Sequence, residues 1–351
     1  VMAILCLSEN LADLKERLGN ILVGFTFDRE PVYAKDLKAQ GAMAALLKDA
    51  VLPNLVQTLE GGPAIIHGGP FANIAQGTNS VLATKMGLSL ADYVITEAGF
   101  GSDLGAEKFY NIKCKSAGLK PRASVLVATI RALKYHGGIS LKELKTPNPE
   151  AVAKGLPNLA KHLENSRLFG VPAVVAINHF DQDSDAEVQV VKDFCESKGF
   201  PVVLCKAWAE GGKGAEELGK AVVEACQEES QFQTLYDWKA PFEEKIRTIA
   251  QRVYGADDID YSVKAKLNLK RIARLGLEGL PICMAKTQKS LSDDPKKIGR
   301  PRHFRIHIRE IEIAAGAGFL IPIAGDIMRM PGLPRTPSAE QIDIDEQGNI
   351  T

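Results

Sequence analysis

SVLVATIRALKYHGG, at residues 124–138, has the pattern of a strand that runs directly into a helix. Its first half is a continuous apolar run of strand length, and its second half carries arginine, lysine and histidine before two glycines. Continuous rather than alternating apolar residues are typical of strands that are buried on both faces of a parallel sheet. The stretch therefore predicts a buried parallel strand with polar groups at its carboxyl end.

Four further segments repeat this pattern of a short apolar run that ends in glycine, a charge or an aromatic residue. They are PAIIHGGPF (63–71), ADYVITEAGFGSD (91–103), VPAVVAINHFDQD (171–183) and PVVLCKAWAEGGKG (201–214). Amphipathic stretches lie between the runs, so strand and helix alternate. Such alternation predicts an α/β fold with a doubly wound, mainly parallel sheet and helices on both faces. Ligands bind at the carboxyl ends of the strands in such folds, where all these polar loops fall.

The remaining segments predict smaller elements. Residues 302–325 alternate apolar and polar residues in their first half, which predicts an antiparallel hairpin. Residues 235–275 are expected to be mostly helical, and residues 2–50 to contain a helix, a strand at ILVGFTF and a second helix from Ala34.

Composition excludes several classes of protein. The 351 residues include 43 Lys plus Arg and 43 Asp plus Glu, so no basic excess supports general binding to nucleic acid or a membrane surface. No apolar run reaches the roughly 18 residues of a membrane span. The six cysteines form no C-x-x-C pair and no zinc-finger spacing, which favours thiols in a reducing compartment and identifies no metal ligands.

Two glycine-rich segments are candidate anion sites. TEAGFGSDLGAEKF places Glu97, Asp103 and Lys108 around three glycines, and HGGPFANIAQGTNS begins with His67. Glycines at a strand end let backbone N–H groups approach a bound anion closely. The alternative is a pair of ordinary turns with solvated charges and a structural histidine.

The opening stretch also carries Arg131, Lys134 and His136 within six residues. An arginine fork and a lysine point charge together suit a transferring phosphoryl or acyl-phosphate group. The alternative is a helix with solvated cations on its outer face.

Aromatic residues follow two of the predicted strands. If those strands are neighbours, Phe180 and Trp208 face each other across a slot for a flat heteroaromatic ligand; the alternative is two core aromatics. Residues 178–181, NHFD, also match the N-x-x-D of guanine-reading loops, which keeps a GTPase-like switch as a further alternative. The nucleotide motif G-x-x-x-x-G-K-S/T occurs nowhere, and GGKG at 211–214 lacks the following serine or threonine.

Taken together and in this order, the segments resemble the formate–tetrahydrofolate ligase family over essentially the whole chain. The matching segments are HGGPFANIAQGTNS, TEAGFGSDLGAEKFYNIKC, VATIRALKYHGG, INHF with its acidic continuation, PICMAKTQKSLSDDP and AGDIMRMPGLP. The resemblance implies that ATP, with Mg²⁺, phosphorylates formate and that tetrahydrofolate then takes the formyl group. It also implies a monovalent cation (K⁺ or NH4⁺), a cytoplasmic location and a homotetramer.

The resemblance assigns two groups of site residues. The tetrahydrofolate pocket comprises Phe180 and Trp208 as a sandwich around the pterin, lined by Leu204 and Phe100. The catalytic candidates are Glu97, Asp103 and Lys108 beside the acyl phosphate, with Arg131, His136 and His67 as further candidates.

The chain departs from the family pattern at several places. The glycine-rich amino-terminal block and the P-loop are missing, so roughly the first third of the enzyme is expected upstream of Val1. Asp181 stands where proline is common, and Gln76 where histidine is common. An alternative function is therefore a folate-binding fragment without ligase activity.

The resemblance also implies a sheet like that of the P-loop nucleotide hydrolases, plus a smaller α/β domain. We expect residues 1–62 to be the remnant of an amino-terminal or second domain, and residues 63–155 a central nucleotide and formyl-phosphate domain. Residues 156–335 are expected to form a folate-side domain with the antiparallel hairpin, and residues 336–351 a tail.

Overall fold

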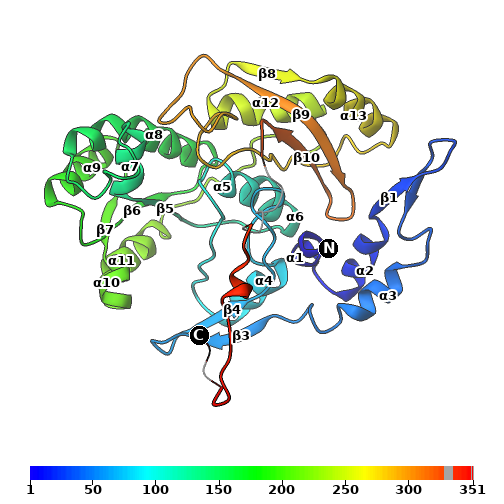
Figure 1. Cartoon of the computed structure of the whole chain (residues 1–351), viewed down its shortest axis with the longest axis horizontal. Coiled ribbons are helices and arrows are strands. Elements are labelled where there is room, and N and C mark those ends of the chain that lie inside the picture. Colours follow the sequence, from blue (N-terminus) through cyan, green and yellow to red (C-terminus); the bar gives the residue numbers. More distant parts are fainter. Residues whose placement is uncertain (328–334, 349, 351) are drawn as a thin grey trace.

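The computed structural model describes residues 1–327, 335–348 and 350 of the chain. Most of the family segment AGDIMRMPGLP falls at residues 328–334, outside the described residues. Figure 1 shows the parallel sheet at the left with helices on both of its sides, helices beside a mixed sheet at the top right, and the amino-terminal helices at the lower right. No described helix is long and apolar enough to cross a membrane.

A three-stranded parallel sheet forms where the sequence predicts it. Its strands lie in the order β5 (Ser124–Ala128), β6 (Ala173–Asn178) and β7 (Val202–Cys205). The first five residues of β6 are buried, as expected for a central strand that is covered on both faces. The helices around it are α7 (Ile130–His136), α8 (Pro149–Leu168), α9 (Asp185–Ser197), α10 (Ala207–Glu210) and α11 (Glu216–Ala225).

Two of the five predicted parallel strands are wrong. The run at residues 63–71 gives β4 (Pro63–Ile66), which pairs antiparallel with β3 (Asn54–Gln57) through a tight turn closed by the bond from Thr58 N to Gly62 O. Strand β4 thus pairs with β3, its neighbour in the sequence, and not with a strand of the parallel sheet. The run at residues 91–103 forms no strand, because a strand requires a hydrogen-bonded neighbour and no described segment pairs with it. The fold is therefore mixed α/β, with a parallel sheet smaller than predicted.

The amino-terminal part consists of short helices and two hairpins. Its elements are α1 (Met2–Leu7), α2 (Leu11–Gly19), β1 (Leu22–Phe25), β2 (Pro31–Tyr33), α3 (Gln40–Leu46) and, after the β3–β4 hairpin, α4 (Val81–Leu90). The strand predicted at ILVGFTF is confirmed as β1. The helix predicted from Ala34 begins instead at Gln40, because Lys38 has a left-handed backbone (φ 55°) that no helix accommodates.

The carboxyl-terminal half confirms the predicted hairpin. β9 (Arg305–Ala314) and β10 (Phe319–Ala324) pair antiparallel, and β8 (Asp258–Tyr261) adds to β9 in parallel. The helices are α12 (Phe242–Thr248), continued by the π-helical η3 (Ile249–Tyr254), and α13 (Val263–Arg274). Between α4 and β5 lie α5 (Gly105–Lys108), the π-helical η1 (Phe109–Cys114) and α6 (Lys115–Ala117).

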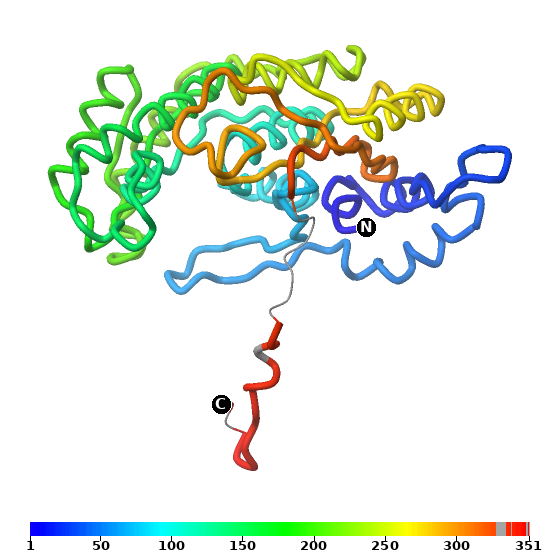
Figure 2. Tube along the Cα trace, turned by 45° about the horizontal axis from the view of Figure 1, so that its top comes forward, coloured from blue at the N-terminus to red at the C-terminus, as the bar shows by residue number. Residues whose placement is uncertain are grey.

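Strand β10 lies between two hydrophobic cores, and its alternate residues face different cores. Leu320 and Ala324 join the core formed with α12, η3 and α13, whereas Phe319, Ile321 and Ile323 join the core formed with α1 and α2. A third core lies between the parallel sheet and the helices α7, α8 and α9. Residues 335–348, with the short 3-10 turn η4 (Ser338–Glu340), project away from all three cores (Figure 2). The three boundaries between the four predicted segments stay predictions.

Candidate functional site

The three basic side chains that follow β5 contact three different partners. The guanidinium of Arg131 lies over the ring of Phe180, 4.8 Å from its centroid. Lys134 is buried and forms an ion pair of 2.8 Å with the equally buried Glu187. His136 accepts a hydrogen bond of 2.9 Å at Nδ1 from the backbone N–H of Gly299. Of the three, Arg131 is the one that contacts Phe180.

Phe180 and Trp208, here called the aromatic pair, meet at the carboxyl edge of the sheet. The condition set by the sequence holds, because β6 and β7 are neighbours and their last paired residues are Asn178 and Cys205. The ring centroids are 6.0 Å apart with an interplanar angle of 54°. Trp208 is 67% exposed, so this is a surface pair and not a core contact. Leu204, in β7, is half-buried and packs against the core of the parallel sheet.

Phe100 is held in an unusual conformation. Its backbone φ is 65°, a left-handed value that is an outlier for a bulky residue, and its side chain is 48% exposed. Such strain costs on the order of 1–3 kcal/mol and gathers at ligand sites. An exposed, strained aromatic residue is a feature that packing alone does not explain.

Asp103 belongs to a buried polar cluster. Its carboxylate forms an ion pair of 2.8 Å with Lys286, and both side chains are buried. Burial alone raises the pKa of Asp103, but Lys286 and then His162 outweigh this effect, so the pKa lies below its ordinary value. The neighbouring Ser102 is hydrogen bonded to His162 Nδ1 at 2.7 Å. Asp103 is thus a paired carboxylate in the interior.

His136 lies within electrostatic range of the same cluster. Its pKa is lowered to about 4, mainly by burial and in part by the nearby His162, while Asp103 acts in the opposite direction. The bond that Nδ1 accepts from Gly299 requires an unprotonated nitrogen there. His136 is therefore neutral at pH 7.

Lys108 and Glu107 are also buried. Lys108 Nζ donates to the carbonyl of Ala72 at 2.6 Å, which joins the two glycine-rich segments. Glu107 accepts from Asn111 at 2.8 Å, and burial raises its pKa to about 7. Glu97, by contrast, is exposed.

His67 is buried with both ring nitrogens engaged. Nε2 lies 2.8 Å from the carbonyl of Ala50, and Nδ1 lies 2.6 Å from the hydroxyl of Ser80. Because a carbonyl only accepts, Nε2 donates to Ala50, and Nδ1 is bonded to the serine that caps α4. Nearby in the sequence, Gln76 is fully buried, and neither atom of its amide has a hydrogen-bond partner among the described residues.

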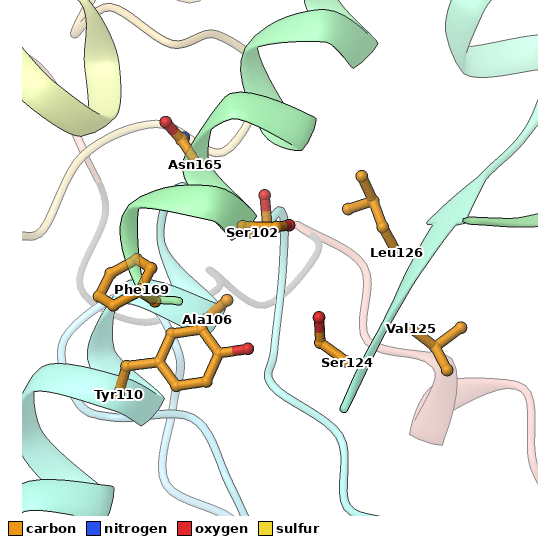
Figure 3. A pocket seen from close by; sticks show the side chains of 9 residues that line it. Ser102, Ala106, Tyr110, Ser124, Val125, Leu126, Asn165 and Phe169 are labelled. Carbon is orange, nitrogen blue, oxygen red and sulfur yellow. The ribbon is translucent and has the colours of Figure 1, made fainter. Parts of the chain in front are cut away.

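A small cavity lies at the opposite end of β5 (Figure 3). It has a volume of about 40 Å³, and its lining includes Ser102, Tyr110, Asn165 and the first three residues of β5. Ligand sites of parallel sheets lie at the carboxyl ends of the strands, so this cavity lies at the other end of β5 from the aromatic pair. In the described parts of the chain, no group of three or more His, Cys, Asp or Glu side chains is placed to hold a metal ion.

The comparisons with known proteins agree with these observations. The family model described as formate–tetrahydrofolate ligase matches residues 1–351. The chain belongs to this family. The chain is also 58% identical, over 356 residues, to a formate–tetrahydrofolate ligase of Psychrobacter sp. (strain PRwf-1). That match covers 100% of the chain and 63% of the relative, so the chain spans less than two thirds of the relative's length.

The sequence did not predict Lys286 and Glu187 as the partners of two buried charges, Asp103 and Lys134. Lys286 follows the apolar run ICMA, and a lysine that closes such a run is a signal for burial with a counter-charge. Glu187 lies three residues after the N-cap Ser184, a capping-box position, and also accepts from the backbone N–H of Asn148. The pairing of Glu187 with Lys134 has no local signal, because it joins residues from two different helices.

Proposed function

We propose that the protein carries out the ATP-dependent ligation of formate to tetrahydrofolate. ATP transfers its γ-phosphoryl group to a formate oxygen, which gives ADP and formyl phosphate. The N10 amine of tetrahydrofolate then attacks the formyl carbon, the bond to the phosphate oxygen breaks, and the products are 10-formyltetrahydrofolate and phosphate. The observation that carries this proposal is the family match over all 351 residues.

The aromatic pair supports a tetrahydrofolate pocket at the carboxyl edge of the parallel sheet. We assign the pterin to the space between Phe180 and Trp208, with Leu204 and Phe100 along its sides. Atoms in contact lie about 3.5 Å apart, so a ring stacked between two parallel rings needs roughly 7 Å between them. The present separation of 6.0 Å at 54° therefore has to widen and level when the pterin enters.

The polar side chains that are bonded inside the protein support a positioning role in the phosphoryl-transfer half. Asp103, Lys108 and His136 are engaged with partners inside the protein, so we propose that they hold the glycine-rich segments in the shape that presents backbone N–H groups to the acyl phosphate. The exposed Glu97 and the guanidinium of Arg131 are the candidates for direct contact. We assign His67 to the support of α4.

Further properties come to the proposal from the family alone. They are Mg²⁺ that arrives with ATP, an assisting K⁺ or NH4⁺ ion, a cytoplasmic location and a homotetramer. No described cluster provides a dedicated metal site, so no chemical step is assigned to a protein-held metal.

The test is ADP release from ATP with and without formate and tetrahydrofolate. Ligation predicts ADP formation that requires formate, and formate-independent ADP formation would refute the assignment.

The alternative, a folate-binding module without ligase activity, is favoured by the absence of G-x-x-x-x-G-K-S/T from the 351 residues. It predicts tetrahydrofolate binding without ADP release. Guanine-nucleotide binding without folate binding would instead support the GTPase-like alternative.

A further inference from the structure

The segment that carries Trp208 is closed on itself. This segment, residues 206–214, is here called the tryptophan loop. The backbone N–H of Lys206 donates to the carbonyl of Gly214 at 2.9 Å, which joins the two ends. A Cβ on Gly214 would lie 2.5 Å from the carbonyl oxygen of Lys206, so glycine is required for this closure. The loop is therefore a compact unit whose two ends are joined.

One contact holds the tip of the tryptophan loop from outside. Glu60, at the turn of the β3–β4 hairpin, accepts a hydrogen bond of 2.6 Å at Oε1 from the backbone N–H of Gly212, 152 residues away. A Cβ on Gly211 would lie 2.6 Å from Oε1 of Glu60, and a Cβ on Gly212 would lie 2.1 Å from Oε2. The carboxylate thus occupies the space that side chains at these two positions would need.

The turn that presents Glu60 is itself well defined. Thr58 N donates to Gly62 O at 2.8 Å and Gly61 N donates to Thr58 O at 2.9 Å, which closes the hairpin around Glu60. The hairpin has no place in the parallel sheet, and most of its side chains are exposed. Its contact with the tryptophan loop links two parts of the molecule that the sheet does not connect.

We propose that Glu60 is a positioning residue that holds the tryptophan loop in place, and that it thereby prepares the aromatic pair to receive a flat ligand, the pterin of tetrahydrofolate. The second half of this inference rests on the proposed function. Trp208 is 67% exposed and lies on a helix of four residues, so few packing contacts fix its ring. An outside anchor lowers the conformational entropy that the loop loses on binding, which strengthens binding without any contact to the ligand.

The first test follows the loop without any ligand. The chain has two tryptophans, Trp208 and Trp238, so a Trp208→Phe variant gives the background to subtract. In Glu60→Ala we expect the fluorescence anisotropy of Trp208 to fall and its quenching by acrylamide to rise. Glu60→Gln keeps an oxygen acceptor of the same reach and should restore wild-type values. Glu217→Ala, which removes an exposed carboxylate from the neighbouring α11, is the matched control and should change neither. Unchanged Trp208 anisotropy and quenching in Glu60→Ala would overturn the proposal.

The second test measures tetrahydrofolate binding by the quenching of Trp208 emission. Glu60→Ala should raise the Kd by about threefold to tenfold, the range expected for the loss of one ordering contact, and Glu60→Gln should again restore it. A mobile Trp208 with an unchanged Kd would overturn the link between the anchor and the ligand. If the wild-type protein does not bind tetrahydrofolate at all, the proposed function fails, and the anisotropy measurement alone decides whether Glu60 holds the loop.

Discussion

The aromatic pair and the polar cluster around Asp103 share a sequence pattern but differ in their exposure to solvent. Both follow apolar runs, and both are expected to face a ligand. At the aromatic pair the structure leaves Trp208 67% exposed, whereas at the polar cluster Lys286 is fully buried and Asp103 is 4% exposed. The difference shows that the aromatic side chains here are exposed to solvent, whereas most of the charged side chains near the proposed site are buried.

Desolvation explains why the two regions differ. A charge that is taken out of water costs several kcal/mol unless a counter-charge and hydrogen bonds replace the solvent. Lys286 meets this requirement with Asp103 and with the carbonyls of Thr287 and Ser290. An exposed tryptophan needs no such partners and remains available to stack on a ligand. We therefore expect changes in the cluster to affect stability first, and changes at the aromatic pair to affect binding.

The largest effect is expected for Lys286→Met. This change leaves Asp103 buried without its counter-charge, which should lower the free energy of unfolding by about 3–5 kcal/mol. Urea denaturation measures the loss. Lys220→Met removes a lysine from an exposed ion pair with Glu217 and should cost less than ~1 kcal/mol. Equal losses in the two variants would contradict the distinction between the two regions.

Glu107→Gln should remove a pH dependence of stability. Burial raises the pKa of Glu107 from 4.5 to about 7, so between these values the folded protein keeps a proton that the unfolded chain has lost. Stability therefore falls as the pH rises through this window, by about 3 kcal/mol in total. The neutral amide cannot titrate and keeps the oxygen that accepts from Asn111.

The measurement is urea denaturation of both proteins from about pH 5 to about pH 8. The difference between them isolates Glu107, because His136 and the other titrating groups are common to both. The variant should gain stability over the wild type as the pH rises, and parallel curves would show that Glu107 titrates normally.

The parts of the fold that local pattern controls were predictable from the sequence, and those that depend on distant partners were not. β5, β6 and β7 are continuous apolar runs, and Ser184 caps α9 as its sequence indicates. The run at 91–103 also contains a short apolar stretch before polar residues but forms no strand, because strand formation also needs a neighbour to supply hydrogen bonds.

The candidate site shows the same limit. The position of Phe180 beside Trp208 follows from the neighbouring strands and could be anticipated. The pairing of Asp103 with Lys286 joins residues 183 positions apart, and no periodicity encodes it. The same holds for the contact of Glu60 with Gly212, since a hairpin turn and a glycine loop carry no signal that they meet.

At the aromatic pair, Trp208→Ala should weaken tetrahydrofolate binding by roughly tenfold. Stacking of a ligand ring on an aromatic side chain is worth about 1–3 kcal/mol per ring. Calorimetry with tetrahydrofolate measures the Kd, and the KM for formate and for ATP should stay near the wild-type values. An unchanged Kd for tetrahydrofolate would remove Trp208 from the pocket.

A smaller effect on binding is expected for Arg131→Met, and it separates two roles for this residue. As a cation stacked 4.8 Å from the Phe180 ring centroid, Arg131 steadies that ring, and such contacts are worth about 0.5–1 kcal/mol, or roughly a twofold to fivefold rise in the Kd for tetrahydrofolate. Gln182→Ala removes the side chain that accepts from the Arg131 guanidinium at 2.9 Å and should show a smaller change in the same direction.

A guanidinium that stabilises the transferring phosphoryl group would behave differently, because its loss would lower kcat for formate-dependent ADP release and leave the folate Kd unchanged. The ratio of the two changes therefore decides whether Arg131 belongs with the exposed aromatic pair or with the phosphoryl-transfer half of the site.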